Sequence, residues 1–201
     1  RYLYNTFLRR AVARLRLLNY SVSTALAPKP ADYLTGAWHG AHDYRAHGEI
    51  VDFSILMTYE WGWSGGPPYA VAPIDKVDEV IRYAVSVMPA NKIMMGMPLY
   101  GYDWTLPYRP GGPFARRVSP QQAIALAAEH GVEILYDQTV QAPHFNYYAS
   151  NGVQHEVWFE DARSVRAKLL LVNRYGLRGV SYWVLGSSFP QNWLVLENMF
   201  N

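Results

Sequence analysis

Hydrophobic positions along the chain follow a helical period in several segments. Spacings of three and four residues predict helices over residues 4–19, 38–47, 75–88, 162–176 and 193–200. Asp75 stands where it would cap the third of these helices. In the run SPQQ, Ser119 has the side chain of an N-cap, Pro120 suits the first helical position and Gln122 completes a capping box. This run predicts one more helix, which ends at Gly131.

Nearly continuous apolar runs form the second pattern. They cover residues 20–28, 50–59, 92–101 and 178–184, and they are typical of parallel strands covered on both faces. Residues 102–160 differ, because a loop rich in proline and glycine precedes the SPQQ helix there. Short alternating runs around Ile134, Phe145 and Trp158 then indicate antiparallel strands.

A strand followed by a helix recurs four times, which favours an α/β fold with a parallel sheet. No G-x-G-x-x-G or G-x-x-x-x-G-K-[ST] follows a strand, so a doubly wound nucleotide-binding sheet is disfavoured. A (β/α)8 TIM barrel needs eight such units and roughly 250 residues. We therefore predict the C-terminal half of a TIM barrel, residues 1–101 and 161–201, with an inserted small α+β subdomain at 102–160.

Composition adds one unusual feature, an excess of aromatic residues. The chain holds 7 Trp, 16 Tyr and 7 Phe, which is 15% of its residues. The formal net charge of +2 indicates no polyanionic partner, and the absence of cysteine excludes disulfides and thiolate metal sites. No apolar run approaches the roughly 20 residues of a membrane span.

The aromatic residues gather where the predicted strands end, which is where the active sites of such barrels lie. These strand ends carry Met57, Tyr59, Glu60, Trp61 and Trp63, then Tyr100, Asp103 and Trp104, then Tyr182 and Trp183. Aromatic rings beside a carboxylate suit a sugar, whose C–H face packs on a ring while its hydroxyls need hydrogen-bond partners. Core packing is the equally open alternative for each tryptophan.

Four motifs carry a family resemblance. MTYEWGW at 57–63, GMPLYG at 96–101, EVWFED at 156–161 and GVSYW at 179–183 resemble the later strands of glycoside hydrolase family 18, the chitinase family. The run WGWSGGPP, followed by AVAPI, is similar to the bacterial members that act on spore cortex or cell-wall peptidoglycan.

The resemblance implies a retaining glycosidase without an enzyme nucleophile, in which the 2-acetamido carbonyl of the substrate attacks the anomeric carbon. Tyr59 matches the tyrosine that positions the acetamido group, Trp183 the floor beneath the reacting sugar, and Met57 a methionine of the same pocket. Glu60 stands where many members have Asp and is expected to bind sugar rather than to protonate it. Trp61 and Trp63 are expected to extend the substrate groove, and Tyr100 and Trp104 to bind substrate. Glu156 and Trp158 are expected to face sugar or to serve the strand.

The catalytic signature of the family, D-x-x-D-x-D-x-E, is not found in the 201 residues. In the family it ends the strand that precedes the helix with which this chain begins, so the resemblance implies the C-terminal portion of a hydrolase. We expect the chain alone to be inactive on chitooligosaccharides and peptidoglycan. A non-catalytic, lectin-like relative is the alternative, and a structural fragment with neither role is a third.

The expected partner is an N-acetylglucosamine-containing polysaccharide, with chitin and peptidoglycan both open, and the expected location is extracellular, in the cell wall or at the spore. Self-association through the exposed edges of a half barrel is expected as well. No cofactor is expected. A metal site at His39, His42 and His47 and a nucleic-acid surface at the arginines of residues 1–16 are both disfavoured, since each fits a solvated helix face.

Overall fold

The described part of the chain, residues 1–200 of a computed structural model, falls into two units that interleave along the sequence. Among the described residues, unit 1 consists of residues 1–58, 76–97 and 171–181, and unit 2 of residues 59–75, 98–170 and 182–200. The predicted division into a half barrel and an insert follows other boundaries and stays a prediction.

Unit 1 contains the predicted parallel sheet. Its strands are β1 (Ser23–Leu26), β2 (Phe53–Leu56), β3 (Ile93–Pro98) and the beginning of β9 (Gly179–Trp183), in the order β1-β2-β3-β9. β2 is parallel to both β1 and β3. All four predicted strands are present, each shorter than its apolar run. Strands among residues 1–200 form no closed barrel, so the half barrel itself stays a prediction.

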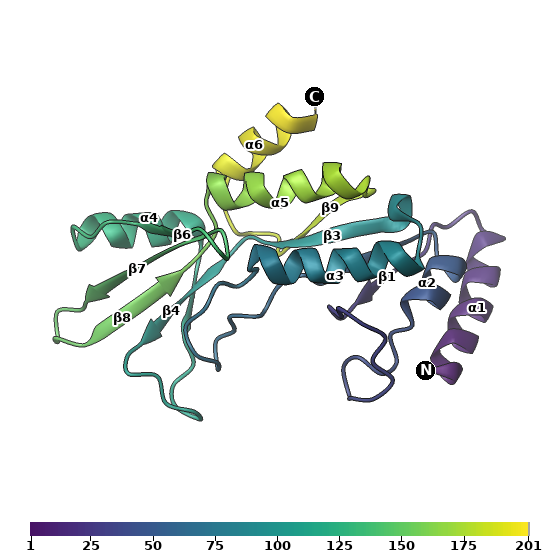
Figure 1. The fold of residues 1–201 in the computed structure, drawn as a ribbon, viewed down its shortest axis with the longest axis horizontal. Helices are drawn as coiled ribbons and strands as arrows, with labels where there is room; N and C mark the ends of the chain where they lie inside the picture. Colours follow the sequence, from purple (N-terminus) through teal and green to yellow (C-terminus); the bar gives the residue numbers. More distant parts are fainter. Residues whose placement is uncertain (201) are drawn as a thin grey trace. The chain divides into compact units, whose positions relative to one another are not determined.

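Helices of unit 1 follow the predicted periods, with two corrections. They are α1 (Tyr2–Arg16), α2 (Tyr44–Ile50), α3 (Ile74–Val87) and the 3-10 turn η1 (Ala90–Lys92), and α1 packs beside α2 (Figure 1). The helix predicted from Trp38 begins only at Tyr44, because the Asp43 carboxylate accepts a hydrogen bond from the Ala46 amide at 3.1 Å and caps it. Asp75 lies inside the first turn of α3 rather than at its cap.

His47 is a fully buried histidine on α2, with Nδ1 2.9 Å from the Thr24 hydroxyl. Burial, followed by the charge of His42, lowers the pKa of His47 from 6.5 to about 4. Between these two pH values the unfolded chain binds a proton that the folded chain excludes, so stability falls as the pH drops from 6.5 to 4.

We therefore expect the free energy of unfolding to lose roughly 3 kcal/mol across this pH window through His47. Urea unfolding at pH 7 and pH 4 measures it, and the difference between wild type and a His47→Gln variant isolates the contribution of this residue. An equal pH dependence in the two proteins would contradict the prediction.

Unit 2 is built on an antiparallel sheet of five strands. These are β4 (Gly101–Thr105), β5 (Arg116–Val118), β6 (Leu135–Asp137), β7 (Ala142–Tyr148) and β8 (Gln154–Trp158), in the order β5-β4-β8-β7-β6. The strands predicted around Ile134, Phe145 and Trp158 are confirmed as β6 to β8. The region read as a loop rich in proline and glycine contains β4 and β5 as well, so that prediction was incomplete.

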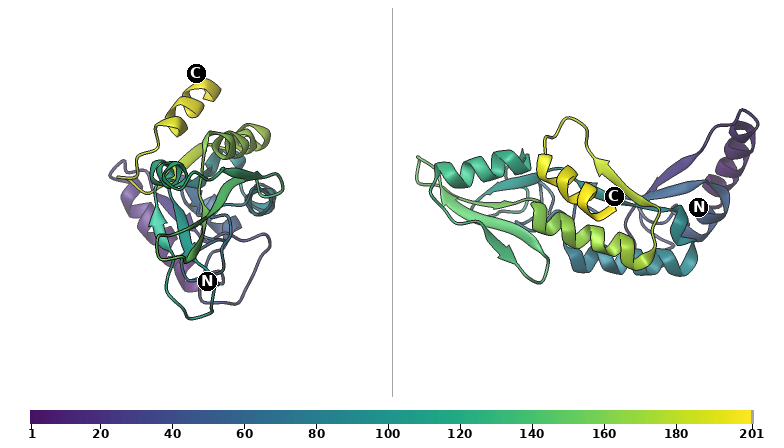
Figure 2. Two further views of the ribbon diagram at one scale, coloured as in Figure 1. Left: turned by 90° about the vertical axis from the view of Figure 1, so that its left-hand side faces the viewer. Right: turned by 90° about the horizontal axis from the view of Figure 1, so that it is seen from above.

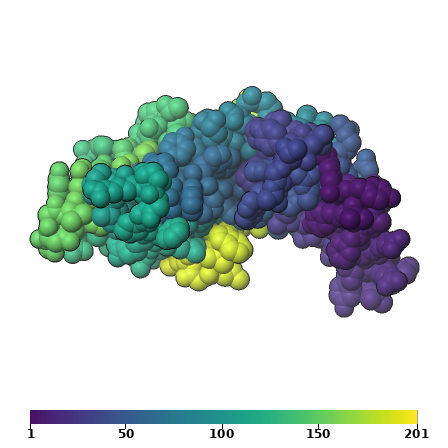
Figure 3. Space-filling view, turned by 90° about the horizontal axis from the view of Figure 1, so that it is seen from below, coloured from purple at the N-terminus to yellow at the C-terminus, as the bar shows by residue number. Residues whose placement is uncertain are grey.

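Helices of unit 2 are α4 (Pro120–Glu129), most of α5 (Ala162–Tyr175) and α6 (Pro190–Phe200). α4 runs along the five-stranded sheet (Figure 2), where Ala123 and Ala127 pack with Phe145, Val157 and Phe159. α6 lies at the molecular surface (Figure 3) and exposes apolar side chains, with Leu194 60% exposed.

The SPQQ prediction is confirmed in detail. The Ser119 hydroxyl accepts a hydrogen bond from the Gln122 amide at 3.2 Å, and the Gln122 side chain accepts one from the Ser119 amide at 2.8 Å.

We expect Ser119→Ala to lower the free energy of unfolding by about 1 kcal/mol, because it leaves an amide of the first turn unpaired. Urea unfolding of Ser119→Ala beside Ser119→Thr, which keeps the acceptor, tests this, and equal losses would refute it.

A buried ion pair ties α5 to the end of β8. Lys168 Nζ lies 2.8 Å from Glu160 Oε2, and both side chains are at most 2% exposed. The Ser164 hydroxyl donates to the same carboxylate oxygen at 2.6 Å. Nothing in the sequence marks this pair, since the two residues are separated by eight positions and look like ordinary surface charges.

Candidate functional site

The loop after β2 enters unit 2 at Tyr59 and carries most of the predicted site residues. It folds back on itself, because the Trp61 amide donates to the Val71 carbonyl at 3.1 Å and the Gly62 amide to the Ala70 carbonyl at 2.9 Å. A Cβ on Gly62 would lie 2.0 Å from the Tyr69 carbonyl oxygen, so only glycine fits there. Glu60, with a φ of 71°, turns the chain into this loop.

Glu60 is held by two tyrosines. Its Oε1 accepts hydrogen bonds from the hydroxyls of Tyr100 and Tyr102, the latter at 2.9 Å. Burial and the nearby Glu60 charge raise the pKa of both tyrosines, so that both hydroxyls stay protonated as donors. No hydrogen bond from residues 1–200 reaches the other oxygen, Oε2, and Glu60 is exposed. A fixed carboxylate is thus presented at the surface.

Tyr59 packs, half-buried, against a cluster that we call the aromatic cluster: Tyr100, Tyr102, Trp104 and Trp158, with Tyr69 at its edge. Neighbouring rings meet edge to face, with 5.5 Å between the ring centroids of Tyr100 and Tyr102 and the same distance between Tyr102 and Trp104. Burial and the charge of Glu60 raise the pKa of Tyr59. Its hydroxyl therefore remains a hydrogen-bond donor at neutral pH.

Two predicted substrate-binding residues lie inside unit 2 instead of on its surface. Trp104 is 2% exposed, and its indole N–H donates to the Gly66 carbonyl at 2.9 Å. Tyr100 is also 2% exposed and holds Glu60. Trp104 and Tyr100 thus contact the loop after β2 from inside unit 2. The prediction for both residues was direct contact with substrate.

Trp63 and Phe114 form an exposed pair of rings. Trp63 is 46% and Phe114 72% exposed, and their ring centroids are 6.4 Å apart. Gly65 and Gly66 lie under Trp63 so closely that a Cβ on either would fall within 2.6 Å of its indole ring. Only glycine at positions 65 and 66 therefore leaves room for the Trp63 ring. Phe114 was missed in the sequence, because it lies in a loop without a motif.

The remaining predicted residues are distributed as follows. Trp183 is 52% exposed at the end of β9, where its carbonyl accepts a hydrogen bond from the Leu99 amide at 2.8 Å. Trp61 is half-buried in the loop. Met57 belongs to unit 1, where its amide donates to the Leu26 carbonyl at 2.9 Å, and its side chain is half-buried. Unit 2 thus contains every predicted site residue except Met57.

Glu156 and Trp158 are joined to each other. The indole N–H of Trp158 donates to Glu156 Oε1 at 2.7 Å, and the Trp158 ring stacks on His144 with 4.3 Å between centroids. Trp158 is 7% exposed. These contacts fit the strand role, one of the two roles left open for this pair.

The three histidines of the metal hypothesis have other contacts in unit 1. His42 Nδ1 accepts a hydrogen bond from the Ala27 amide at 2.8 Å, His47 bonds Thr24, and His39 lies edge-on to Tyr33. Among residues 1–200 no three His, Cys, Asp or Glu side chains are grouped as a metal ion would require.

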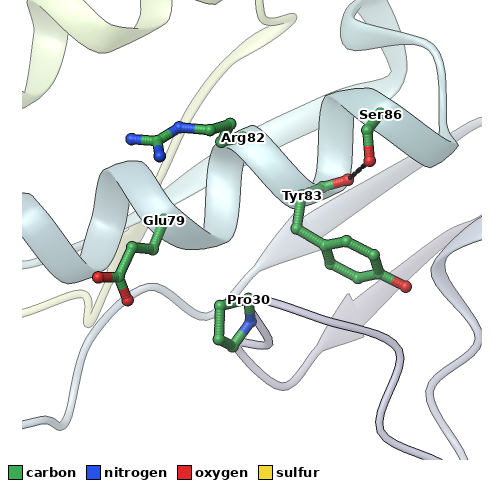
Figure 4. A pocket seen from close by; sticks show the side chains of 5 residues that line it. All are labelled: Pro30, Glu79, Arg82, Tyr83 and Ser86. Atoms are coloured by element: carbon green, nitrogen blue, oxygen red, sulfur yellow. Dashed lines mark hydrogen bonds between the residues drawn. The ribbon is translucent and has the colours of Figure 1, made fainter.

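A separate hollow in unit 1 is lined by residues of α3 and by Pro30, which follows β1 (Figure 4). It measures about 330 Å3 and is lined by Pro30, Glu79, Arg82, Tyr83 and Ser86. Arg82 pairs with Asp78, and the Ser86 hydroxyl donates to the Tyr83 carbonyl. It contains none of the predicted site residues, and its charges are already partnered within α3.

Helices long and apolar enough to cross a membrane do not occur in the part of the chain that is described.

Comparison with known proteins identifies the family. The model of glycosyl hydrolases family 18 matches residues 1–187. The chain is 61% identical over 198 residues to a cortical fragment-lytic enzyme of Bacillus subtilis, covering 98% of this chain and 46% of that protein. It therefore spans about half the length of the curated relatives it matches.

Solved structures agree. The crystal structure of the Bacillus cereus spore cortex-lytic enzyme SleL superposes with a TM-score of 0.95 at 54% identity, and that of the Bacillus megaterium enzyme with 0.95 at 53%. Each covers 98% of this chain, which is 46% and 45% of the respective solved chain. With the family model, the high identity and the shared fold in agreement, the chain belongs to glycosyl hydrolase family 18.

Proposed function

We propose that this chain forms the acetamido-sugar-binding part of a glycosidase that cleaves β-1,4 bonds in N-acetylglucosamine polymers, with peptidoglycan of the spore cortex as substrate. The observation that carries the proposal is the Glu60 carboxylate, fixed by Tyr100 and Tyr102 beside the protonated hydroxyl of Tyr59. The names of the cortex-lytic relatives support the choice of polymer.

In the proposed mechanism, the Tyr59 hydroxyl donates a hydrogen bond to the acetamido carbonyl of the substrate. This carbonyl oxygen attacks the anomeric carbon, the glycosidic bond breaks, and an oxazolinium intermediate forms that water opens with net retention. Glu60 accepts a hydrogen bond from a sugar hydroxyl through its open oxygen. Its second role is to hold the loop at the correct distance from the reacting sugar.

Aromatic rings of unit 2 supply the sugar contacts in this proposal. The face of Trp183 lies under the reacting sugar, and Trp61 and Trp63 extend the groove toward neighbouring sugars. Met57, which belongs to unit 1, stays a predicted sugar contact. Tyr100 acts through Glu60 as a positioning residue, and Trp104 supports the loop, so we assign neither a direct contact with substrate.

Proton donation to the leaving oxygen is the step for which we assign no residue of this chain. The D-x-x-D-x-D-x-E motif is absent from its 201 residues, and the carboxylate of Glu60 is engaged by two donors. We therefore propose that this chain binds glycan without turning it over, and that the complete hydrolytic cycle belongs to the whole protein.

Removing the Trp183 ring, which is proposed to lie under the reacting sugar, tests the proposal. We expect Trp183→Ala to weaken binding of chitotetraose about tenfold, since a sugar face loses its aromatic partner. Isothermal titration calorimetry measures the affinity. Trp38→Ala is the matched control, because Trp38 is 70% exposed and belongs to unit 1. Equal affinities of the Trp183→Ala and Trp38→Ala proteins would count against the proposed site.

Self-association and a location at the spore or cell wall are also part of the proposal. β1 and β9 are the outer strands of the parallel sheet, and their outer edges offer unpaired backbone groups that support self-association. The cortex-lytic relatives support a location at the spore or cell wall. We expect light scattering to give a mass above 22.9 kDa, and a monomer with an unchanged open sheet would contradict self-association.

A further inference from the structure

Two neighbouring arginines on β5 have different surroundings. Arg116 Nη2 lies 2.9 Å from Asp103 Oδ2, and that buried carboxylate also accepts a hydrogen bond from Tyr147. Successive residues of a strand point to opposite faces of the sheet, and Arg117 is paired in register with Tyr102 on β4. Arg117 therefore lies on the face of the sheet from which Tyr102 reaches Glu60.

Arg117 is oriented by stacking and not by an ion pair. Its guanidinium carbon lies 4.1 Å from the centroid of the Tyr100 ring, and the hydroxyl of the same ring donates to Glu60. Among the described residues no carboxylate lies within ion-pair distance of Arg117, which is exposed. A cation–π contact holds the guanidinium over the ring without neutralising its charge. The unpaired positive charge of Arg117 thus lies over the same Tyr100 ring whose hydroxyl binds Glu60.

A hollow of about 440 Å3 opens beside this charge. It is lined by polar residues, namely Arg117, Ser119, Gln121, Gln122, Ser187 and Ser188, together with Val118 and Gly186. Arg117 is the one charged residue of the lining. The capping box of α4 uses the oxygens of Ser119 and Gln122 as acceptors, so the hydroxyl and amide hydrogens of these side chains remain available. The hollow therefore combines a fixed cation with neutral donors, the combination that suits an anion with several oxygens.

We propose that Arg117 and this hollow bind a carboxylate carried by the glycan, and that they make the site selective for an acidic glycan over a neutral one. Chitin is neutral, whereas every N-acetylmuramic acid of peptidoglycan carries a lactyl group whose carboxyl is free or bears a peptide with carboxyls of its own. The inference rests on the proposed function and specifies its substrate class. Arg117 is a specificity-determining residue in this account and takes no part in bond cleavage.

Calorimetric titration of the protein with three defined ligands tests the inference. The ligands are chitotetraose, the acidic tetrasaccharide of alternating N-acetylglucosamine and N-acetylmuramic acid, and the same tetrasaccharide with its lactyl carboxyls converted to amides. At low salt we expect Arg117→Gln to weaken binding of the acidic ligand about tenfold and to leave the affinity for the two neutral ligands unchanged. We expect 0.5 M salt to reduce the wild-type preference as well.

Arg166→Gln is the matched control, since it removes an exposed positive charge on α5 in the same unit. Arg117→Lys keeps the charge but not the planar stack, and should retain part of the preference. Equal affinity of the wild type for the acidic and amidated ligands, or an unchanged preference in Arg117→Gln, would overturn the inference and leave the proposed function standing. Failure of all three ligands to bind would refute the proposed function itself, and this inference with it.

Discussion

Glu60→Ala is expected to weaken binding of chitotetraose by about a hundredfold. The carboxylate is a charge-assisted hydrogen-bond acceptor for sugar, and such a bond contributes about 1.5–3 kcal/mol. Its loss also leaves the buried hydroxyls of Tyr100 and Tyr102 without an acceptor and frees the loop that carries Tyr59. Isothermal titration calorimetry of the variant against wild type measures the change.

Two controls separate these causes. Glu60→Gln retains an oxygen that can accept from the two tyrosines. Its affinity for chitotetraose should fall about tenfold, since only the charge is removed. Glu133→Ala removes an exposed carboxylate elsewhere in unit 2 and should leave the affinity unchanged. If Glu60→Ala bound chitotetraose as tightly as Glu133→Ala does, Glu60 would have no place in the site.

Lys168→Ala is expected to lower the free energy of unfolding by about 3–5 kcal/mol, because it leaves the buried Glu160 carboxylate without its counter-ion. Folded domains have only about 5–15 kcal/mol of stability, so this single change brings the protein close to unfolding at room temperature. Urea unfolding followed by circular dichroism measures the loss.

The double variant Glu160→Gln with Lys168→Met is the matched comparison for Lys168→Ala, since it removes both charges and keeps a similar side-chain volume. We expect it to be more stable than Lys168→Ala, because no unpaired charge remains buried. A loss of less than about 1 kcal/mol in the free energy of unfolding of Lys168→Ala would show that the ion pair is not shielded from water. A double variant less stable than Lys168→Ala would show the same.

Local signals in the sequence were sufficient for most helices and strands. The period of α5 gave its bounds, and the Ser119 and Gln122 capping box gave the start of α4, because both depend on neighbours within one turn. The apolar spacing around Trp38 predicts too early a start for α2, because the helix is capped by Asp43 and begins at Tyr44. The apolar run 92–101 reads as one strand, but β3 ends at Pro98 and Gly101 opens β4, which pairs with β5 and β8 instead.

Strand pairing explains what sequence reasoning could not predict. Tyr102 and Trp104 lie on one face of β4 and Asp103 on the other, but which face meets Glu60 depends on the register with β5 and β8, which is set by residues far along the chain. The same register separates the paired Arg116 from the unpaired Arg117. Motif positions therefore gave Tyr59, Glu60 and Trp63 as candidates, whereas the supporting roles of Tyr100 and Trp104 required the fold.

The central claim, that this chain binds N-acetylglucosamine glycan but does not cleave it, is tested by measuring both properties in one sample. The protein is titrated with chitotetraose by calorimetry, and the same mixture is assayed for new reducing ends over a day. We predict saturable binding that Glu60→Ala weakens about a hundredfold, with reducing ends no higher than in a blank without protein. Release of reducing ends above the blank, lost in Tyr59→Phe, would contradict the claim, as would the absence of saturable binding.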